Sequence, residues 1–197
     1  MINLIKENFE KKNYKFFDSD KAYNLNIFSV RTSPSIVNQF DDYIFCVYKD
    51  KYNRWRIHQW ECTTDPGAFY LKNPMKIDGT AILVPGQYIN VYAIDKHKGE
   101  YDALCQRLGD VKVYRDSNRD GVHDFDPNTI QEGRFGINIH NSGHRDSKVV
   151  EKWSAGCTVF RVPEDFEQFM YLCKIYKELY GNQFTYTLFN EEDFKLN

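Results

Sequence analysis

Hydrophobic and polar residues alternate along most of the chain, and this pattern predicts a protein built mainly of β-strands. Short runs rich in Val, Ile, Tyr and Phe are separated by turns that contain Gly, Asn, Asp or Pro. The predicted strands cover about residues 25–31, 43–49, 54–62, 80–84, 88–95, 110–115, 135–140, 157–161 and 184–190.

Two segments follow the spacing of an amphipathic helix instead. Residues 2–12 predict a short helix, and residues 163–180 predict a longer one near the C-terminus. Pro163 suits the first helical position and Gly181 suits the stop. The predicted buried face of the longer helix consists of Phe166, Phe169, Met170, Cys173 and Tyr176. We therefore expect a mainly β fold with flanking helices, in the α+β class.

No internal repeat, low-complexity tract or Pro/Gly/Ser-rich linker divides the chain, so we expect a single domain over residues 1–197. A chain of 197 residues can bury a sizeable core. A hydrophobic content of 42% with a net charge of -2 is typical of an ordinary globular protein. Basic residues form no block and no RNA-binding aromatic motif is present, so we expect no nucleic-acid partner.

The N-terminal segment, the apolar runs and the cysteines indicate in which cellular compartment the protein is expected. The N-terminal segment mixes charged with apolar residues, so it predicts no signal peptide. No apolar run approaches the ~20 residues of a membrane span. The five cysteines lack CxxC spacing, which argues against a disulfide framework and favours reduced thiols.

The residues that carry chemistry lie in one short segment. Gly136-Ile-Asn-Ile-His140 ends an alternating apolar run, and Ser154-Ala-Gly-Cys157 opens the next predicted strand. A thiol becomes a useful nucleophile when a neighbouring base favours the thiolate, which lowers its pKa, and histidine is the usual partner. The small residues before Cys157 leave room for substrate and free the backbone amides of Gly156 and Cys157 for an oxyanion. We predict that Cys157 is a nucleophile and that His140 is its base.

These residues also have a structural interpretation. Free cysteines are often buried, and a lone histidine is commonly a hydrogen-bonded structural residue. The Ser-Ala-Gly turn before Cys157 favours the catalytic interpretation. His144 suggests a His/His/Cys metal site with His140 and Cys157, but the intervening residues predict a turn and no fourth ligand is evident.

The segment resembles the catalytic motif of the L,D-transpeptidase (YkuD-type) family. In that motif a His is followed, after about fourteen to seventeen residues, by Ser/Thr-His-Gly-Cys and then by Asn or Arg two places on. His140, Ser154, Gly156 and Cys157 match this pattern. Residues 79–88 weakly echo an upstream Thr-Pro-x-Gly-x-Tyr/Phe segment of the family.

Two positions depart from the motif. Ala155 stands where the family has its second His, and Val159 stands where it has Asn or Arg. Arg161 lies two residues further on, so on an extended strand its guanidinium would share the face of Val159. We expect Arg161 to bind a substrate carboxylate through a bidentate contact.

The resemblance covers about residues 40–175 and leaves residues 1–40 as an N-terminal extension. It implies an L,D-transpeptidase-like β-sandwich that acts as a catalytic domain. The implied activity is acyl transfer on peptidoglycan stem peptides through a thioester on Cys157, with no required cofactor. In the family a backbone carbonyl just after the His orients it, and here that carbonyl belongs to Asn141 or its neighbour. Trp153 is expected to be either a lid over the substrate or a core anchor.

Without a signal peptide, such a protein would be made in the cytoplasm and would reach the cell wall after release, as a phage-type lysin does. The acceptor can be water or an amine, and a lytic role favours water. Two alternatives remain open: a catalytically inactive cell-wall-binding or phage structural module on the same fold, and an intracellular cysteine hydrolase.

A second constellation, Asp116-Ser-Asn118-Arg-Asp120-Gly-Val-His-Asp124, has the spacing of a calcium loop. Oxygens at positions one, three and five converge because the glycine permits a sharp turn, and position nine can add a ligand. The closing bidentate Glu is absent, since position twelve is Pro127. The sequence therefore predicts either an open structural calcium loop or a solvated hairpin.

Overall fold

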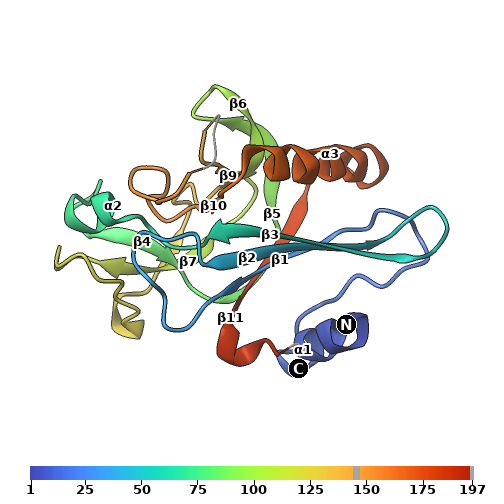
Figure 1. Ribbon diagram of the computed structural model, residues 1–197, viewed down its shortest axis with the longest axis horizontal. Coiled ribbons are helices and arrows are strands. Elements are labelled where there is room, and N and C mark those ends of the chain that lie inside the picture. The colour runs from blue at the N-terminus through green and yellow to red at the C-terminus, as the bar shows by residue number, and fades with distance from the viewer. Residues whose placement is uncertain (144–146, 196–197) are drawn as a thin grey trace.

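The computed structural model describes residues 1–143 and 147–195 and shows a mainly β protein with few helices (Figure 1). The helices are α1 (Ile2–Lys11), α2 (Ala68–Lys72) and α3 (Pro163–Tyr180), with the 3-10 turns η1 (Pro127–Thr129) and η2 (Glu191–Asp193). The strands are β1 (Asn26–Arg31), β2 (Asp42–Lys49), β3 (Trp55–Thr63), β4 (Thr80–Leu83), β5 (Gly86–His97), β6 (Tyr101–Gln106), β7 (Val111–Asp116), β8 (Gln131–Gly133), β9 (Ile139–Asn141), β10 (Thr158–Phe160) and β11 (Phe184–Asn190). The predicted mainly β class with a C-terminal helix is confirmed.

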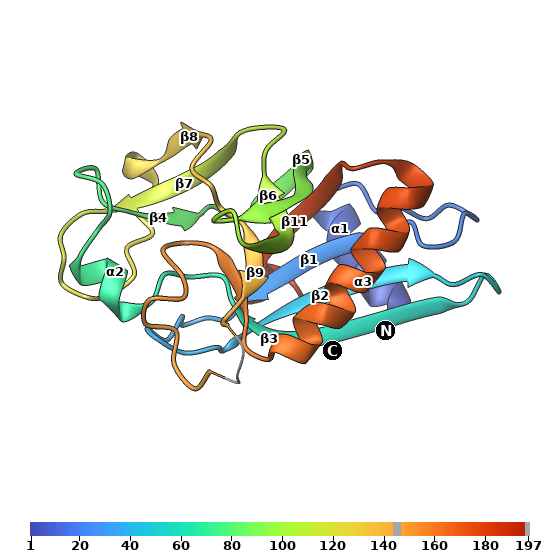
Figure 2. The same cartoon turned by 90° about the horizontal axis from the view of Figure 1, so that it is seen from above.

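Eight strands close into a barrel in the order β1-β11-β5-β6-β9-β10-β3-β2. The pairs β1–β11 and β9–β10 are parallel and the other barrel pairs are antiparallel. Strands β4, β7 and β8 form a separate antiparallel sheet that lies beside the barrel (Figure 2). The β-sandwich implied by the resemblance is not confirmed, because the main sheet closes on itself and so has no free edge.

Helix α3 packs into the main hydrophobic core. Its Phe166 and Phe169 rings lie 5.5 and 5.1 Å from the ring of Phe160 in β10. The helix begins with Pro163 in its first turn, and Gly181 follows its end with a φ of 91°. The predicted bounds are therefore confirmed, and the aromatic contacts fix the strand that directly follows Cys157.

The N-terminal region belongs to the barrel assembly. Helix α1 buries Ile5 and Phe9 in a second hydrophobic cluster, against Phe28 of β1 and Phe45 of β2. Strand β1 itself pairs with β2 and β11. The segment expected as an N-terminal extension thus contributes both a barrel strand and the helix that covers it. Within the described ranges no helix is long and apolar enough to cross a membrane.

Strand β6 was not predicted, and neither were β8 and the short helix α2. Strands β5 and β6 form a hairpin whose two turn residues, Lys98 and Gly99, have φ values of 51° and 79°. Positive φ at both central positions is the geometry of the tight turns that suit hairpins. The Lys-Gly pair was therefore the sequence signal for this hairpin, and His97 before it is the last residue of β5.

Strand β9 is shorter than the predicted strand over 135–140. Over residues 135–137 the backbone amides bond to the side chain of Gln106 and not to a neighbouring strand. The Gln106 side-chain oxygen accepts hydrogen bonds from the amides of Phe135, Gly136 and Ile137 at 3.1, 2.9 and 3.2 Å. The Gln106 amide nitrogen donates to the carbonyls of Gly109 and Gly133 at 3.0 and 2.9 Å. Gln106 is buried, so one carboxamide satisfies a stretch of backbone that no strand pairs with.

Candidate active site

Cys157 follows a tight turn that is pinned against the second sheet. The hydroxyl of Ser154 donates to the carbonyl of Cys157 at 2.8 Å and accepts from the amide of Gly156 at 3.1 Å. Gly156 has a φ of 119°, and a Cβ added there would lie 2.1 Å from the carbonyl oxygen of Ala81 in β4. Only glycine fits this approach, and Ser154 is fully buried. Ser154 therefore shapes the turn that presents the thiol.

This turn changes the expected oxyanion site. The Gly156 amide already donates to Ser154, so it is engaged within the turn. The Cys157 amide donates to no acceptor in residues 1–143 and 147–195. Of the two predicted oxyanion donors, the amide of Cys157 remains available.

His140 lies on β9, which pairs with β10, the strand that directly follows Cys157. The parallel register of β9 and β10 places Val159 opposite His140, and the Thr158 amide donates to the Asn138 carbonyl at 3.0 Å. The ring Nδ1 of His140 donates to the carbonyl of Asn141 at 2.8 Å, which is the contact that the resemblance implied. This bond assigns the proton to Nδ1 and leaves Nε2 with its lone pair.

The thiol and the imidazole do not hydrogen-bond directly among the described atoms. The Cys157 sulfur accepts from the Asn138 amide at 3.4 Å and donates to the Gly136 carbonyl at 3.5 Å. Both side chains nevertheless line the same cavity. Catalytic hydrogen bonds are often long without substrate, so this geometry is compatible with proton transfer after substrate binds.

A second imidazole completes the site. The ring of His97 stacks on that of His140 with centroids 4.0 Å apart and an interplanar angle of 22°. The side-chain amide of Asn138 donates to Nδ1 of His97 at 3.1 Å. The hydroxyl of Tyr101 lies 3.4 Å from Nδ1 of His140. From the sequence, the segment from His97 to Tyr101 could approach the cleft, although a loop residue was the simpler interpretation of His97, and Asn138 had no expected role.

Burial governs the protonation of the site. It lowers the pKa of His140 to about 3, with the neighbouring His97 as a further cause, and it lowers the pKa of His97 to about 4. Burial also raises the pKa of Cys157 to about 11, against the opposing effects of the Asn138 amide and Lys98. The sequence predicted a lowered pKa for this thiol, and the structure gives the opposite direction. At neutral pH the thiol and both imidazoles are therefore uncharged.

Cys157 opens into a cavity of about 360 Å³ between the barrel and the second sheet. His140 lines this cavity and also a second one of about 760 Å³, whose lining includes Asn141 and Trp153. Trp153 is 44% exposed, so it lies at the edge of the second cavity and is no core anchor. Cavities of this size suit a small ligand or a short peptide.

Arg161 does not reach either cavity. Its guanidinium forms an ion pair with Glu61 of β3, and its backbone amide donates to the Glu61 carbonyl at 3.1 Å. The pairing of β10 with β3 brings these two residues together. The expected contact of Arg161 with a substrate carboxylate is therefore replaced by an ion pair inside the protein.

The cysteines differ in exposure. All five lie in the described part of the chain and none forms a disulfide there. Cys46, Cys62, Cys105 and Cys173 are buried, and Cys157 is partly exposed. Cys157 is thus the one thiol among them that a reagent in solution can reach. His144, which the sequence suggested as a metal ligand, lies outside the described residues.

The acidic loop is closed by its own hydrogen bonds. The Asn118 amide nitrogen donates to Asp120 and Asp124 at 3.0 and 2.7 Å. The Asp124 backbone amide donates to the carboxylate of Asp116 at 3.2 Å. In the described part of the chain, no three His, Cys, Asp or Glu side chains are placed to hold a metal ion. The carboxylates of the loop therefore already accept hydrogen bonds from the loop itself, and the calcium interpretation stays a prediction.

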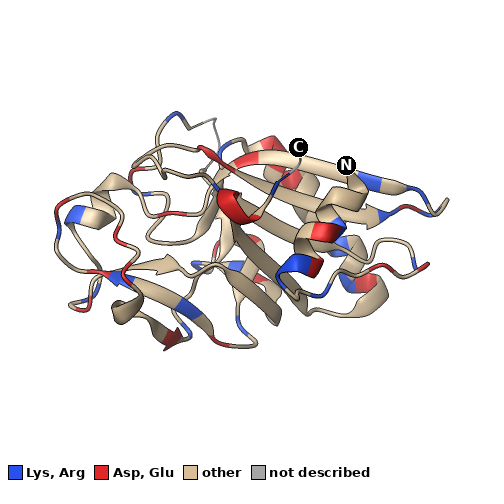
Figure 3. Cartoon of the chain, turned by 90° about the horizontal axis from the view of Figure 1, so that it is seen from below, with Lys and Arg blue, Asp and Glu red and all other residues tan. Residues whose placement is uncertain are grey.

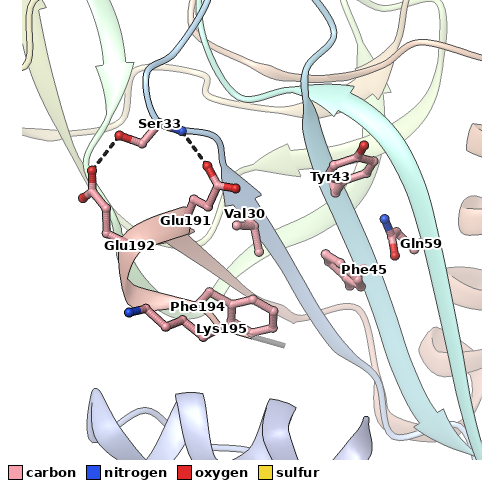
Figure 4. A pocket seen from close by; sticks show the side chains of 9 residues that line it. All are labelled: Val30, Ser33, Tyr43, Phe45, Gln59, Glu191, Glu192, Phe194 and Lys195. Atoms are coloured by element: carbon pink, nitrogen blue, oxygen red, sulfur yellow. Dashed lines mark hydrogen bonds between the residues drawn. The ribbon is translucent and has the colours of Figure 1, made fainter. Parts of the chain in front are cut away.

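A third cavity, of about 670 Å³, lies between β1, β2, β3 and η2 (Figure 4). Ser33 closes one end, since its amide donates to Glu191 at 3.0 Å and its hydroxyl to Glu192 at 2.6 Å. The described residues that line it include no cysteine or histidine and none that lines the cavity of Cys157. The chemistry expected from the sequence therefore belongs to the other two cavities.

Comparisons of the chain with family models, curated proteins and solved structures gave no match.

Proposed function

We propose that this protein is a cysteine-dependent acyltransferase or hydrolase of the L,D-transpeptidase type that acts on peptidoglycan stem peptides. The observation that supports it is the placement of Cys157 and His140 at one cavity: His140 lies on β9, and Cys157 directly precedes β10, the strand that pairs with β9. The contact of His140 to Asn141 leaves its Nε2 free. An L,D-transpeptidase-like fold and the expected release to the cell wall are parts of the same proposal.

In the proposed reaction, the Cys157 sulfur attacks a peptide carbonyl while its proton passes to Nε2 of His140. The amide of Cys157 stabilises the oxyanion that forms. The C–N bond then breaks, His140 returns its proton to the leaving amine, and a thioester remains on Cys157. Water or an amine attacks the thioester, again giving a proton to His140, and the thiol is regenerated. This order of steps requires that His140 starts uncharged, because only an uncharged imidazole can accept the proton of the thiol.

Water is the acceptor that we propose, which makes the protein a lytic carboxypeptidase or endopeptidase. The test is digestion of purified sacculi of several wall chemotypes, followed by mass spectrometry of the muropeptides. The wild-type protein should release or shorten stem peptides, whereas Cys157→Ser and His140→Ala should each lose nearly all activity. Cys105→Ser is the matched control, since Cys105 is buried and its sulfur lies 3.5 Å from the Asp95 carbonyl, to which a serine hydroxyl can also donate.

The second candidate is an inactive binding module on the same fold. It is favoured by the lack of a direct bond between Cys157 and His140 among the described atoms, and by Ala155 and Val159 at motif positions. Unchanged muropeptides together with retention of the protein on sacculi would support this module. Unchanged muropeptides without retention would favour a cysteine hydrolase that acts inside the cell.

A further inference from the structure

The cavity of Cys157 carries a strong excess of positive charge. Five basic residues line it, and none of the described residues that line it is acidic. The basic residues are Lys76, Lys98, Arg115, Arg134 and Lys152. The whole chain has a net charge of -2, and basic and acidic segments are interspersed along the ribbon (Figure 3). The charge of the cavity is therefore a local arrangement.

Arg115 is the basic residue of this cavity whose side chain is held in place by the protein. It lies on β7 and is only 8% exposed. Its Nε donates to the side chain of Gln131 at 2.9 Å, and its Nη1 donates to the carbonyl of Gly79 at 3.2 Å. The guanidinium carbon lies 4.5 Å from the ring centroid of Phe135. These contacts hold the guanidinium plane in one orientation at the cavity wall.

The charge of Arg115 has no partner. No carboxylate among the described residues lies within 4.0 Å of it, so it forms no ion pair there. Burial lowers the pKa of Arg115, and the charge of Asp78, beyond ion-pair distance, acts in the opposite direction. Nη2 has no hydrogen-bond partner among the described residues, yet it is not fully buried. The guanidinium of Arg115 thus has hydrogen-bond acceptors and an aromatic ring beside it but no carboxylate to balance its charge, so an anion in the cavity would be favoured.

Lys98 places a second positive charge beside the thiol. It lies in the β5–β6 turn, and its charge lowers the pKa values of Cys157 and His140. Within the part of the chain that the structure describes, Lys98, Lys76 and Lys152 form no ion pair with a carboxylate. Arg134 pairs with Asp110 at 3.6 Å, and both of these side chains are exposed. Four of the five cations are therefore available to a ligand.

We propose that Arg115, assisted by Lys98, binds a carboxylate of the acyl substrate beside Cys157, so that the site selects substrates carrying a negative charge near the reacting carbonyl. A guanidinium held in one plane suits a carboxylate, because its parallel N–H groups match the two oxygens. This inference rests on Cys157 as the reacting thiol of the proposed function. It does not rest on peptidoglycan as the substrate.

The test compares two alkylating reagents of nearly equal size, iodoacetate and iodoacetamide, which differ in charge. Their rates at Cys157 are measured at one pH by peptide mass spectrometry, and each is divided by its rate with a free cysteine derivative. The normalised rate for iodoacetate should exceed that for iodoacetamide by about tenfold or more at low salt, because a cationic cavity concentrates anions. The excess should fall as salt is added.

Variants assign the effect to residues. Arg115→Gln should lower the preference for iodoacetate several-fold while leaving iodoacetamide nearly unchanged, and Arg115→Lys should keep most of it. Lys21→Gln, at an exposed site without an ion pair, is the matched control and should change neither rate. If Arg115→Gln does not fold, Lys152→Gln provides the same comparison. Lys98→Gln is then read only from the ratio of the two normalised rates, because Lys98 also lowers the pKa of Cys157 and its loss slows both reagents.

Two outcomes would overturn the proposal. Equal normalised rates for the two reagents with the wild-type protein would show that the cavity does not select anions. An equal loss of both rates in Arg115→Gln would show that Arg115 only supports the fold. Selective alkylation with unchanged muropeptides would instead keep anion selection and reject peptidoglycan as the substrate.

Discussion

A change of pH tests whether Cys157 rests as a thiol or as a thiolate. Burial raises its pKa to about 11, so about 10⁻⁴ of the molecules carry the thiolate at pH 7. An ordinary cysteine with a pKa of about 8.5 has a thiolate fraction of about 3% at that pH, which is roughly 300 times more. The thiolate is the reactive form, so the alkylation rate should rise about tenfold per pH unit between pH 7 and pH 10.

The measurement is the rate of iodoacetamide labelling at Cys157 from pH 6 to pH 10.5, followed by mass spectrometry. The same chain unfolded in urea provides the reference, because its cysteines titrate near their ordinary pKa. At pH 7 the folded protein should react far more slowly than the unfolded chain, and the two curves should converge as pH rises. Lys98→Gln should slow the reaction further at each pH, since Lys98 lowers the pKa of this thiol.

A plateau that begins below pH 8 would refute this reasoning. It would mean that Cys157 is already a thiolate paired with a protonated histidine, as the sequence alone suggested. The proton transfer in the proposed mechanism would then precede substrate binding instead of accompanying the attack.

Three further predictions concern stability. Gly156→Ala should lower the free energy of unfolding in urea by about 3 kcal/mol or more, because the added Cβ meets both an unfavourable left-handed backbone and a clash. Gly136→Ala, where the added Cβ has open space around it, should lose only the part that comes from backbone strain. Gln106→Met should cost about 3 kcal/mol, because three amides, two part-buried and one buried, lose their shared acceptor. The partly exposed Gln87→Met should cost clearly less, and equal losses would contradict this. If the acidic loop binds calcium, the melting temperature should rise with the logarithm of calcium concentration and Asp120→Ala should abolish the rise; identical curves in calcium and chelator would leave the solvated hairpin.

The parts of the fold that sequence predicted depend on local patterns. Helix α3 was placed because Pro163 and Gly181 bracket a clear apolar stripe, and most strand positions follow from alternation. Closure of the barrel could not be predicted, because it requires β1 to pair with β11 from the far end of the chain. The pairing partners of a strand are set by packing over the whole core, which a local window does not contain.

The same division applies to the candidate site. Cys157 and His140 were found because they lie close in sequence and in a recognisable order. Arg115 was missed because its significance depends on a cavity formed between two sheets. Arg161 was misplaced because its partner, Glu61, comes from a distant strand that the sequence does not reveal. The role of a charged residue can depend on whether a distant part of the chain supplies its ion-pair partner, and only the three-dimensional structure shows this.

The carboxamide of Gln106 also sets how the cavity wall can move. Three consecutive amides beside Cys157 share one acceptor atom, so rotation of a single side chain would release all three at once. Their exchange with deuterated solvent should therefore be correlated, with one common opening free energy for Phe135, Gly136 and Ile137. The barrel strands need not separate for this opening, so the wall can fluctuate while the hydrogen-bonded amides between β9 and β10 stay protected from exchange.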